Sequence, residues 1–176
     1  MSEAARHADR GLPAGFEWLG PGRDRSDEIF AVVGRGRFFS DFGVDDVSDL
    51  ADYMNVYAAA SGTPLIREGD TGDFMVFVLS GRVDILKRDA HGADQHMTYA
   101  GPGAVLGEMS MIDGEPRFAS CVAIDRVNLA VLTRDDMGRL LVERPGLGAK
   151  ILVKLVTMLS QRLRQASAEL VKRRGR

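Results

Sequence analysis

Two side chains of opposite charge lie close together in the stretch LGEMSMIDGEPRFAS, residues 106–120. Glu108 follows a glycine, and Arg117, nine residues later, follows a Gly-Glu-Pro turn. A guanidinium can bind two phosphate oxygens at once, whereas a carboxylate repels phosphate and accepts a hydrogen bond from a hydroxyl group. The pair therefore indicates a ribose phosphate ligand, with a plain surface turn as the alternative.

The residues around this pair could form a cradle for an anion. Gly103 and Gly107 permit close approach of the backbone or a positive φ. The segment EMSMI predicts a single helical turn, whose first N–H groups and partial positive dipole attract phosphate. The turn at residues 114–116 would then bring Arg117 back towards the start of that helix.

A β unit must position this stretch. Between residues 55 and 133 the sequence consists of short apolar or alternating segments separated by glycine-containing turns. We therefore predict a mainly β fold with flanking helices, built on an eight-stranded antiparallel β-roll or jelly roll. The eight expected strands cover residues 55–60, 64–68, 74–81, 82–88, 95–100, 104–107, 119–124 and 128–133.

Helical spacing of apolar residues precedes and follows the β unit. We expect N-terminal helices from Ser26 to just before Gly34 and over residues 44–54. A short helix from residue 134 ends at Pro145, because proline cannot continue it. A long C-terminal helix over residues 147–174 would then extend about 40 Å. Its apolar residues, at steps of three or four, include Leu152, Leu155, Leu159, Leu163, Ala166 and Leu170.

The chain divides into three segments. Residues 1–25 are rich in glycine and proline, which predicts an irregular arm with Phe16 and Trp18 packed on the domain surface. Residues 26–133 hold the N-terminal helices and the β-roll, and residues 134–176 hold a hinge helix and the long helix. A chain of 176 residues with 45% hydrophobic and 27% charged residues suits one domain with its own core.

Composition also bears on compartment and partners. The formal net charge of -2 gives no argument for nucleic acid as the main partner. Cys121 is the single cysteine, so no internal disulfide can form, and its apolar strand predicts a core position. The N-terminus lacks the apolar region of a signal peptide, and no apolar run approaches the roughly 18 residues that span a bilayer. We expect a cytoplasmic protein without a membrane partner.

Catalytic motifs are missing from the sequence. His7, His91 and His96 are isolated, so their spacing predicts no metal site. Ser110 and Ser120 have no histidine or aspartate partner in a triad-like motif. We therefore predict a protein that is not an enzyme, with no catalytic residue, no metal and no cofactor.

Residues 107–120 resemble the phosphate-binding cassette of cyclic nucleotide-binding domains. That pattern reads Gly-Glu, several mostly apolar residues, a loop, Pro-Arg, a small residue, Ala, and Ser or Thr, and it occurs here without an insertion. The stretches SGTPLIREGDTGDFMVFVLSGRVDIL and ERPGLGAKILVKLVTMLSQRL resemble the earlier strands and the C-terminal helices of the family. The resemblance covers roughly residues 38–165. It points to a stand-alone sensor domain like that of catabolite activator protein, without a helix-turn-helix domain.

The resemblance implies a role for each cassette position. Glu108 would bind the ribose 2′-hydroxyl, and Arg117 would pair with the cyclic phosphate. The backbone N–H groups of Met109, Ala119 and Ser120 would complete the anion site. Gly107 would permit close approach of the ligand. Besides Glu108 and Arg117, the positions expected to bind the ligand are Gly107, Met109, Ser110, Phe118, Ala119 and Ser120.

Phe118 departs from the family pattern, which has a small residue or threonine there. A threonine at that position favours cGMP through its hydroxyl, which phenylalanine lacks, so the resemblance favours cAMP over cGMP. An aromatic ring could stack on the base, which contributes about 1–3 kcal/mol per base in other proteins. It could equally crowd the pocket or turn into the core.

The function implied by the resemblance is that of a regulatory sensor. It would bind a cyclic nucleotide and signal through movement of its C-terminal helices or through an effector protein that the sequence does not identify. The stripe of apolar residues along the long C-terminal helix implies a homodimer. Two alternatives stay open: a ligand-independent dimerisation or protein-interaction module with the same fold, and a truncated transcription regulator.

Overall fold

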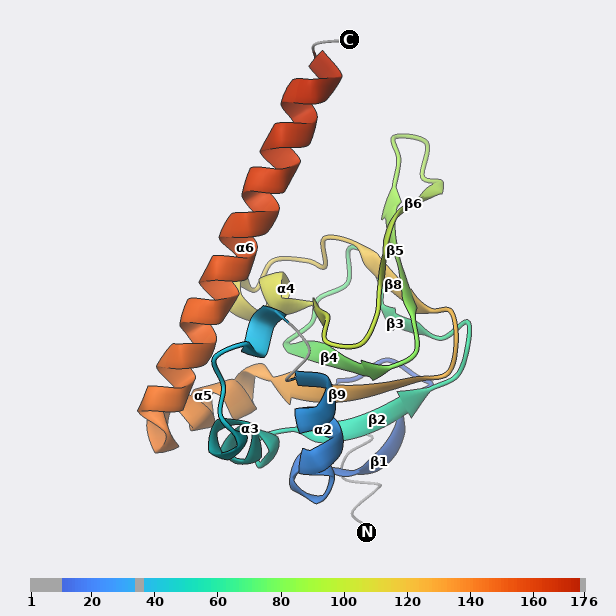
Figure 1. Ribbon diagram of the computed structural model, residues 1–176. Helices are drawn as coiled ribbons and strands as arrows, with labels where there is room; N and C mark the ends of the chain where they lie inside the picture. Colours follow the sequence, from blue (N-terminus) through green and yellow to red (C-terminus); the bar gives the residue numbers. More distant parts are fainter. Residues whose placement is uncertain (1–10, 34–36, 175–176) are drawn as a thin grey trace.

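The computed structural model describes residues 11–33 and 37–174 and shows two antiparallel sheets, one of them covered by helices (Figure 1). The sheets have the strand orders β1-β2-β9-β4-β7 and β3-β8-β5-β6. The strands are β1 (Glu17–Pro21), β2 (Asn55–Ala59), β3 (Pro64–Ile66), β4 (Phe74–Ser80), β5 (Val83–Arg88), β6 (Asp94–Ala100), β7 (Val105–Leu106), β8 (Ser120–Ala123) and β9 (Val127–Thr133). The helices are η1 (Gly22–Arg25), α2 (Ser26–Val33), η2 (Arg37–Phe39), α3 (Val44–Ala51), α4 (Glu108–Asp113), α5 (Arg134–Glu143) and α6 (Pro145–Arg174), where η marks a 3-10 helix.

The predicted fold class is confirmed, and all eight expected strands are present as β2 to β9. A ninth strand, β1, lies in the segment predicted as an irregular arm, where it pairs antiparallel with β2. Glycine and proline occur throughout that segment, so its local sequence does not indicate a strand. The strand forms through pairing with the distant β2. Phe16 and Trp18 pack on the core between the sheets, as predicted. Residues 1–10 of the predicted arm lie outside the described part of the chain, and the three-segment division stays a prediction.

Strand β4 separates two apolar cores. Successive side chains of a strand point to opposite faces, and here both faces of β4 are covered. Phe74, Val76 and Val78 face the core between the sheets. Met75 and Phe77 face the core beneath the helices. The unbroken apolar run of this strand therefore reflects burial on both sides.

The C-terminal helices pack against the second of these cores. Pro145 ends α5 and opens α6, consistent with the tolerance of proline in a first helical turn. Ile151 and Leu155 are fully buried, and Met158 packs against the same core. The side chains from residue 161 to 171 are exposed, and Figure 1 shows this half of α6 extending past the sheets.

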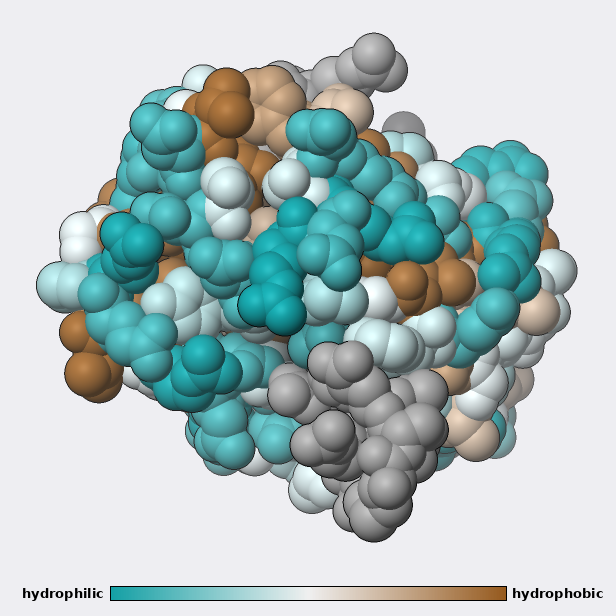
Figure 2. All heavy atoms as spheres, turned by 90° about the horizontal axis from the view of Figure 1, so that it is seen from below, coloured by the Kyte–Doolittle hydropathy of each residue, from teal (hydrophilic) through white to brown (hydrophobic). Residues whose placement is uncertain are grey.

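The described surface at one end of the molecule is largely polar. Seen from the end of the molecule that carries α2 and β1, it is mostly hydrophilic with scattered apolar patches (Figure 2). Among the described residues, none of the helices has the length and apolar character needed to cross a membrane. Cys121 is buried, as predicted, and burial raises its pKa to about 12, which keeps the thiol protonated and unreactive.

Candidate functional site

Arg117 is a buried arginine in the loop between α4 and β8, with 4% of its surface exposed. Its Nη1 donates to the carbonyl of Gly107 at 2.8 Å, and its Nη2 donates to the carbonyl of Phe74 at 2.9 Å. The guanidinium also lies 4.4 Å above the centre of the Phe74 ring, a cation–π contact. Burial lowers the pKa of this guanidinium, but an arginine stays ionised at neutral pH.

The loop between β3 and β4 holds the backbone of Arg117 in place. The Arg117 N–H donates to the carbonyl of Asp70 at 2.8 Å, and the Gly69 N–H donates to the Arg117 carbonyl at 2.9 Å. Gly72 lies against the guanidinium, and a Cβ there would approach Arg117 Cζ to 2.6 Å. This loop therefore has a glycine at residue 72 because the arginine occupies the space of a side chain.

Glu108 is the first residue of α4 and is buried beside this arginine, with 2% of its surface exposed. It follows Gly107, which has a left-handed φ of 80° and where a Cβ would lie 2.6 Å from Arg117 Nη1. The Glu108 carboxylate forms an ion pair with Arg162 of α6. Burial raises the pKa of Glu108, and the charges of Arg162 and Arg117 act in the opposite direction.

The predicted helical turn EMSMI is present as α4, and an arginine ties its end to α5. Arg134 donates from Nε to the carbonyl of Met111 at 2.8 Å and from Nη2 to the carbonyl of Ser110 at 2.7 Å. These carbonyls lie in the last turn of α4, where a cation is favourable. Ser110, predicted to bind the ligand, is buried, and its carbonyl serves this internal contact.

The segment that follows Arg117 is fastened to β5. Phe118 is 52% exposed, so its ring has not turned into the core, which removes one of the three placements left open by the sequence. Lys87 Nζ lies 4.4 Å from the centre of the Phe118 ring and donates to the Phe118 carbonyl at 2.6 Å and to Glu68 Oε1 at 2.8 Å. The Ser120 hydroxyl accepts a hydrogen bond from the Glu68 N–H at 3.0 Å.

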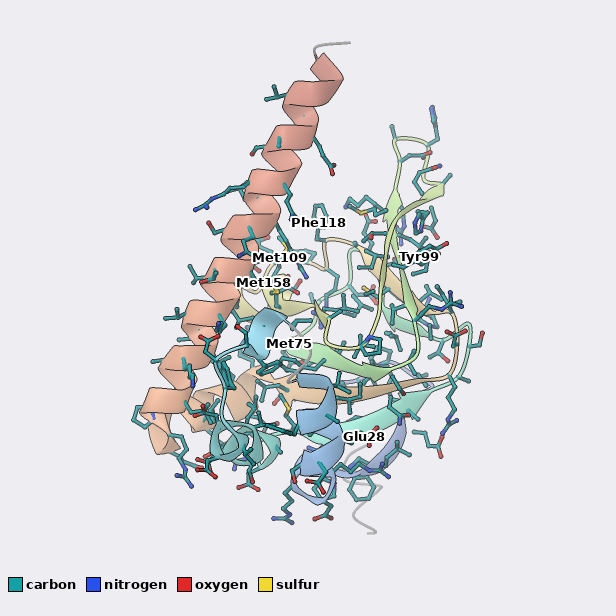
Figure 3. The ribbon with its side chains drawn as sticks, in the orientation of Figure 1. Glu28, Met75, Tyr99, Met109, Phe118 and Met158 are labelled. Carbon is teal, nitrogen blue, oxygen red and sulfur yellow. The ribbon has the colours of Figure 1, made fainter. Side chains whose placement is uncertain are left out.

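The structure brings together the central predicted residues and leaves others at the edge. Arg117 donates to the carbonyl of Gly107, Glu108 is the next residue, and the charge of Arg117 acts on the pKa of Glu108. Met109, at 41% exposure, and Phe118, both labelled in Figure 3, are on the surface. Ala119 is half-buried on the segment that follows Arg117.

Arg162 is a contact residue of this site that the sequence did not reveal. It lies on α6, 45 residues after Arg117, among polar side chains typical of a solvated helix face. One signal was available: Ile151, Leu155 and Met158 form the stripe of α6 that packs on the body, and residue 162 is its next position. That position places Arg162 on the face of α6 that packs on the body, but the sequence does not indicate which residue it meets there.

Metal ligands do not gather in the described part of the chain, where no group of three or more histidine, cysteine, aspartate or glutamate residues could hold an ion. The predicted absence of metal stays a prediction, because His7 lies outside the described residues. The charged groups of the site are a buried acid, Glu108, a buried arginine, Arg117, and two exposed arginines, Arg134 and Arg162. Arginines are well suited to binding a polar anion.

Known proteins are similar to this chain in sequence and in fold. The family model for the cyclic nucleotide-binding domain matches residues 58–144. The crystal structure of a cyclic nucleotide-binding domain from Methylobacillus flagellatus is 38% identical, covers 90% of this chain and 89% of its own, and superposes with a TM-score of 0.80. The chain belongs to the cyclic nucleotide-binding domain family. The matched segment of this cyclic nucleotide-binding domain includes Glu108 and Arg117 and ends before Arg162.

Longer regulatory proteins contain a similar domain. The cyclic AMP receptor protein of Thermus thermophilus is 30% identical over 132 residues, which is 75% of this chain and 59% of that protein. A cAMP-dependent protein kinase regulatory subunit of Blastocladiella emersonii is 29% identical over 123 residues, 68% of this chain and 30% of that protein. This cyclic nucleotide-binding domain thus spans about 60% or less of the length of these curated relatives.

We predict that Gly72→Ala destabilises the domain through Arg117. The added methyl group must displace a buried guanidinium from its two carbonyl partners, and overpacking of this kind costs about 1–3 kcal/mol. Denaturant unfolding measures the loss. Gly101→Ala is the matched control, because a Cβ at Gly101 meets nothing within 4 Å. Equal stability of the two variants would show that Arg117 moves aside freely.

We predict a pH-dependent effect for Glu108→Gln. Since burial raises the pKa of Glu108 in the folded state, the charged carboxylate costs free energy there relative to the unfolded chain. That cost is absent below the unfolded pKa of about 4.5 and grows as pH rises through the folded pKa. The variant should therefore gain stability relative to the wild type between pH 4 and pH 7. Thermal unfolding at several pH values checks this, with Glu115→Gln, an exposed glutamate, as the control; a difference that does not change with pH would contradict it.

Proposed function

We propose that this cyclic nucleotide-binding domain is a regulatory sensor that binds cAMP in preference to cGMP at the cassette of residues 107–120. The observation that carries the proposal is the burial of Arg117 beside Glu108 with opposite charges and separate partners. Burial of two ionised groups costs free energy unless each has a charged or hydrogen-bonding partner. A ligand with an anionic phosphate and a neutral ribose hydroxyl suits both.

Arg117 is suited to hold the phosphate. A guanidinium has five N–H donors in a rigid plane. Among the described residues, its hydrogen bonds go to the two carbonyls of Gly107 and Phe74, which fixes its plane and leaves donors for an anion. An arginine oriented in advance loses little entropy when it binds phosphate.

Glu108 is suited to accept the ribose 2′-hydroxyl. Its carboxylate has several acceptor sites and lies at the start of α4, one residue after the glycine that Arg117 contacts. The exposed side chains of Met109 and Phe118 would then face the base. Phe118 has no hydroxyl to offer guanine, which supports cAMP, and relatives named as a cyclic AMP receptor protein and a cAMP-dependent kinase subunit support the same nucleotide.

The signal would leave the domain through its C-terminal helices. Arg134 joins the end of α4 to the start of α5, and Arg162 joins its beginning to α6. A change in α4 on binding would therefore alter the contacts of both helices. A ligand shifts such an equilibrium only by its difference in affinity for the two arrangements.

The proposed function predicts binding that depends on Arg117. Wild-type protein should bind cAMP more tightly than cGMP in a calorimetric titration, and Arg117→Ala should weaken cAMP binding about 30-fold or more, because a buried charged partner is lost. Arg82→Ala, which removes an exposed arginine paired with Asp125, is the control and should bind like the wild type. Circular dichroism of each variant separates loss of binding from loss of fold. No binding of either nucleotide to the wild type would favour the ligand-independent interaction module.

We also propose that α6 forms a homodimer through its outer face. Leu152, Val156, Leu159, Leu163, Ala166 and Leu170 alternate at steps of four and three, the spacing of a coiled-coil seam. Four of them, Leu152, Val156, Leu163 and Leu170, are between 38% and 68% exposed. Leu155, which the sequence placed in the same stripe, is buried against the body and does not belong to this face.

The dimer proposal predicts that Leu163→Glu produces monomers in sedimentation equilibrium, because it places two like charges in the seam. Gln165→Glu adds the same charge on another face of the helix and should leave the assembly unchanged. A wild-type protein that sediments as a monomer would contradict the proposal.

A further inference from the structure

Lys87 of β5 fastens the exposed aromatic residue of the cassette. Its Nζ lies 4.4 Å from the centre of the Phe118 ring, donates to the Phe118 carbonyl at 2.6 Å and donates to Glu68 Oε1 at 2.8 Å. A lysine ammonium has three N–H donors and no acceptor. A carbonyl, a carboxylate and the face of a ring can engage all three donors. Lys87 is therefore placed to act on a ligand through Phe118 and not by a hydrogen bond of its own.

Strand pairing and Glu68 fix the position of this lysine. Leu86 pairs with Ser120 in the ladder of β5 and β8, which places the next residue, Lys87, beside the end of the cassette. Glu68 Oε2 accepts the Arg88 N–H at 2.9 Å, and the Glu68 N–H donates to the Ser120 hydroxyl at 3.0 Å. The hydrogen bond from Lys87, together with that from the Arg88 N–H, lowers the pKa of Glu68. The carboxylate therefore stays ionised opposite the lysine at neutral pH.

A phenylalanine at residue 118 needs such a fastening if it is to serve a ligand. It directly follows the buried Arg117, and at 52% exposure its ring is not fixed by an apolar core. A ring that is free to change rotamer must be ordered when a ligand packs on it, at a cost in entropy. The contacts of Lys87 order the ring and its backbone in advance. Since half of the residue still faces solvent, surface remains for a base to contact.

We propose that Lys87 determines base specificity in the nucleotide site as a positioning residue, which presents the Phe118 ring to the base and is itself held by Glu68. The inference rests on the proposed function, which gives the cassette a cyclic nucleotide. It adds two residues outside the cassette of residues 107–120. Stacking on an aromatic ring depends on the size of the base, and a purine presents a larger face than a pyrimidine. The arrangement therefore adds a preference for purines over pyrimidines.

Removal of the Lys87 ammonium should reduce this purine preference. We expect Lys87→Met to weaken cAMP binding about twofold to tenfold in calorimetry, the range for one side chain that must be ordered on binding, and to weaken cCMP binding less. Lys150→Met is the matched control. Lys150 Nζ pairs with Asp46 at 2.6 Å and lies 4.7 Å from the centre of the Phe42 ring, a similar set of contacts between α6 and α3. This control should leave both affinities unchanged.

A double-mutant cycle separates positioning of the ring from a general structural role of Lys87. In a Phe118→Ala background, Lys87→Met should no longer change the ratio of the cCMP and cAMP dissociation constants, because no ring is left to position. A change of the same size in both backgrounds would overturn the proposal, and so would an unchanged ratio when Phe118 is present. Tighter cAMP binding by Lys87→Met would also overturn it, because Lys87 would then hold the ring in the way of the base.

The χ1 rotamer of Phe118 gives a readout that does not need nucleotide. Scalar couplings from the backbone nitrogen and carbonyl carbon to the ring Cγ measure rotamer populations in isotope-labelled protein. One rotamer should dominate in the wild type and in Lys150→Met, and several should be populated in Lys87→Met. Rotamer averaging in the wild type would overturn the positioning. If the wild type binds no cyclic nucleotide, the proposed function and this inference fail together, whereas cAMP binding with a base preference that Lys87→Met does not change removes only this inference.

Discussion

A buried arginine needs acceptors for its N–H groups, and the geometry of the cassette follows from meeting that need for Arg117. The carbonyls of Gly107 and Phe74 supply two acceptors, and the Phe74 ring supplies a face for the cation. Both carbonyls must point at one spot, so β4 and the start of α4 are fixed relative to each other. Glycines at residues 72 and 107 leave the space that the guanidinium fills.

Glu108 is held by a different balance. Its burial disfavours the charged form, and the nearby arginines only partly offset that effect, so the pKa stays raised. A carboxylate in this situation gains from any additional donor. The donor in the structure is Arg162 of α6, and the donor proposed for the bound state is a ribose hydroxyl. Glu108 therefore connects the proposed ligand site to α6.

The outer rim of the site has the side chains that would select a base. Phe118 is held in an exposed position by Lys87, which contacts both its ring and its carbonyl, and Lys87 is in turn held by Glu68. A ring fixed in this way offers a flat apolar surface at little entropic cost. Specificity for the base would therefore rest on shape and stacking more than on hydrogen bonds from this position.

The local features of the domain were determined by the sequence itself. Apolar alternation and glycine turns sufficed for eight of nine strands, Pro145 for the break between α5 and α6, and the spacing of Glu108 and Arg117 for the cassette. These signals are local, because they depend on side-chain periodicity and backbone preference within a few residues. The tertiary structure decided what depends on distant partners: the pairing of β1 with β2, the outward position of Phe118 on Lys87, the division of the α6 stripe into a packed and an exposed face, and the contact of Arg162 with Glu108. A charged residue on a helix has the same local pattern whether it meets water or a buried acid, and only the packing of α6 across the cassette distinguishes the two.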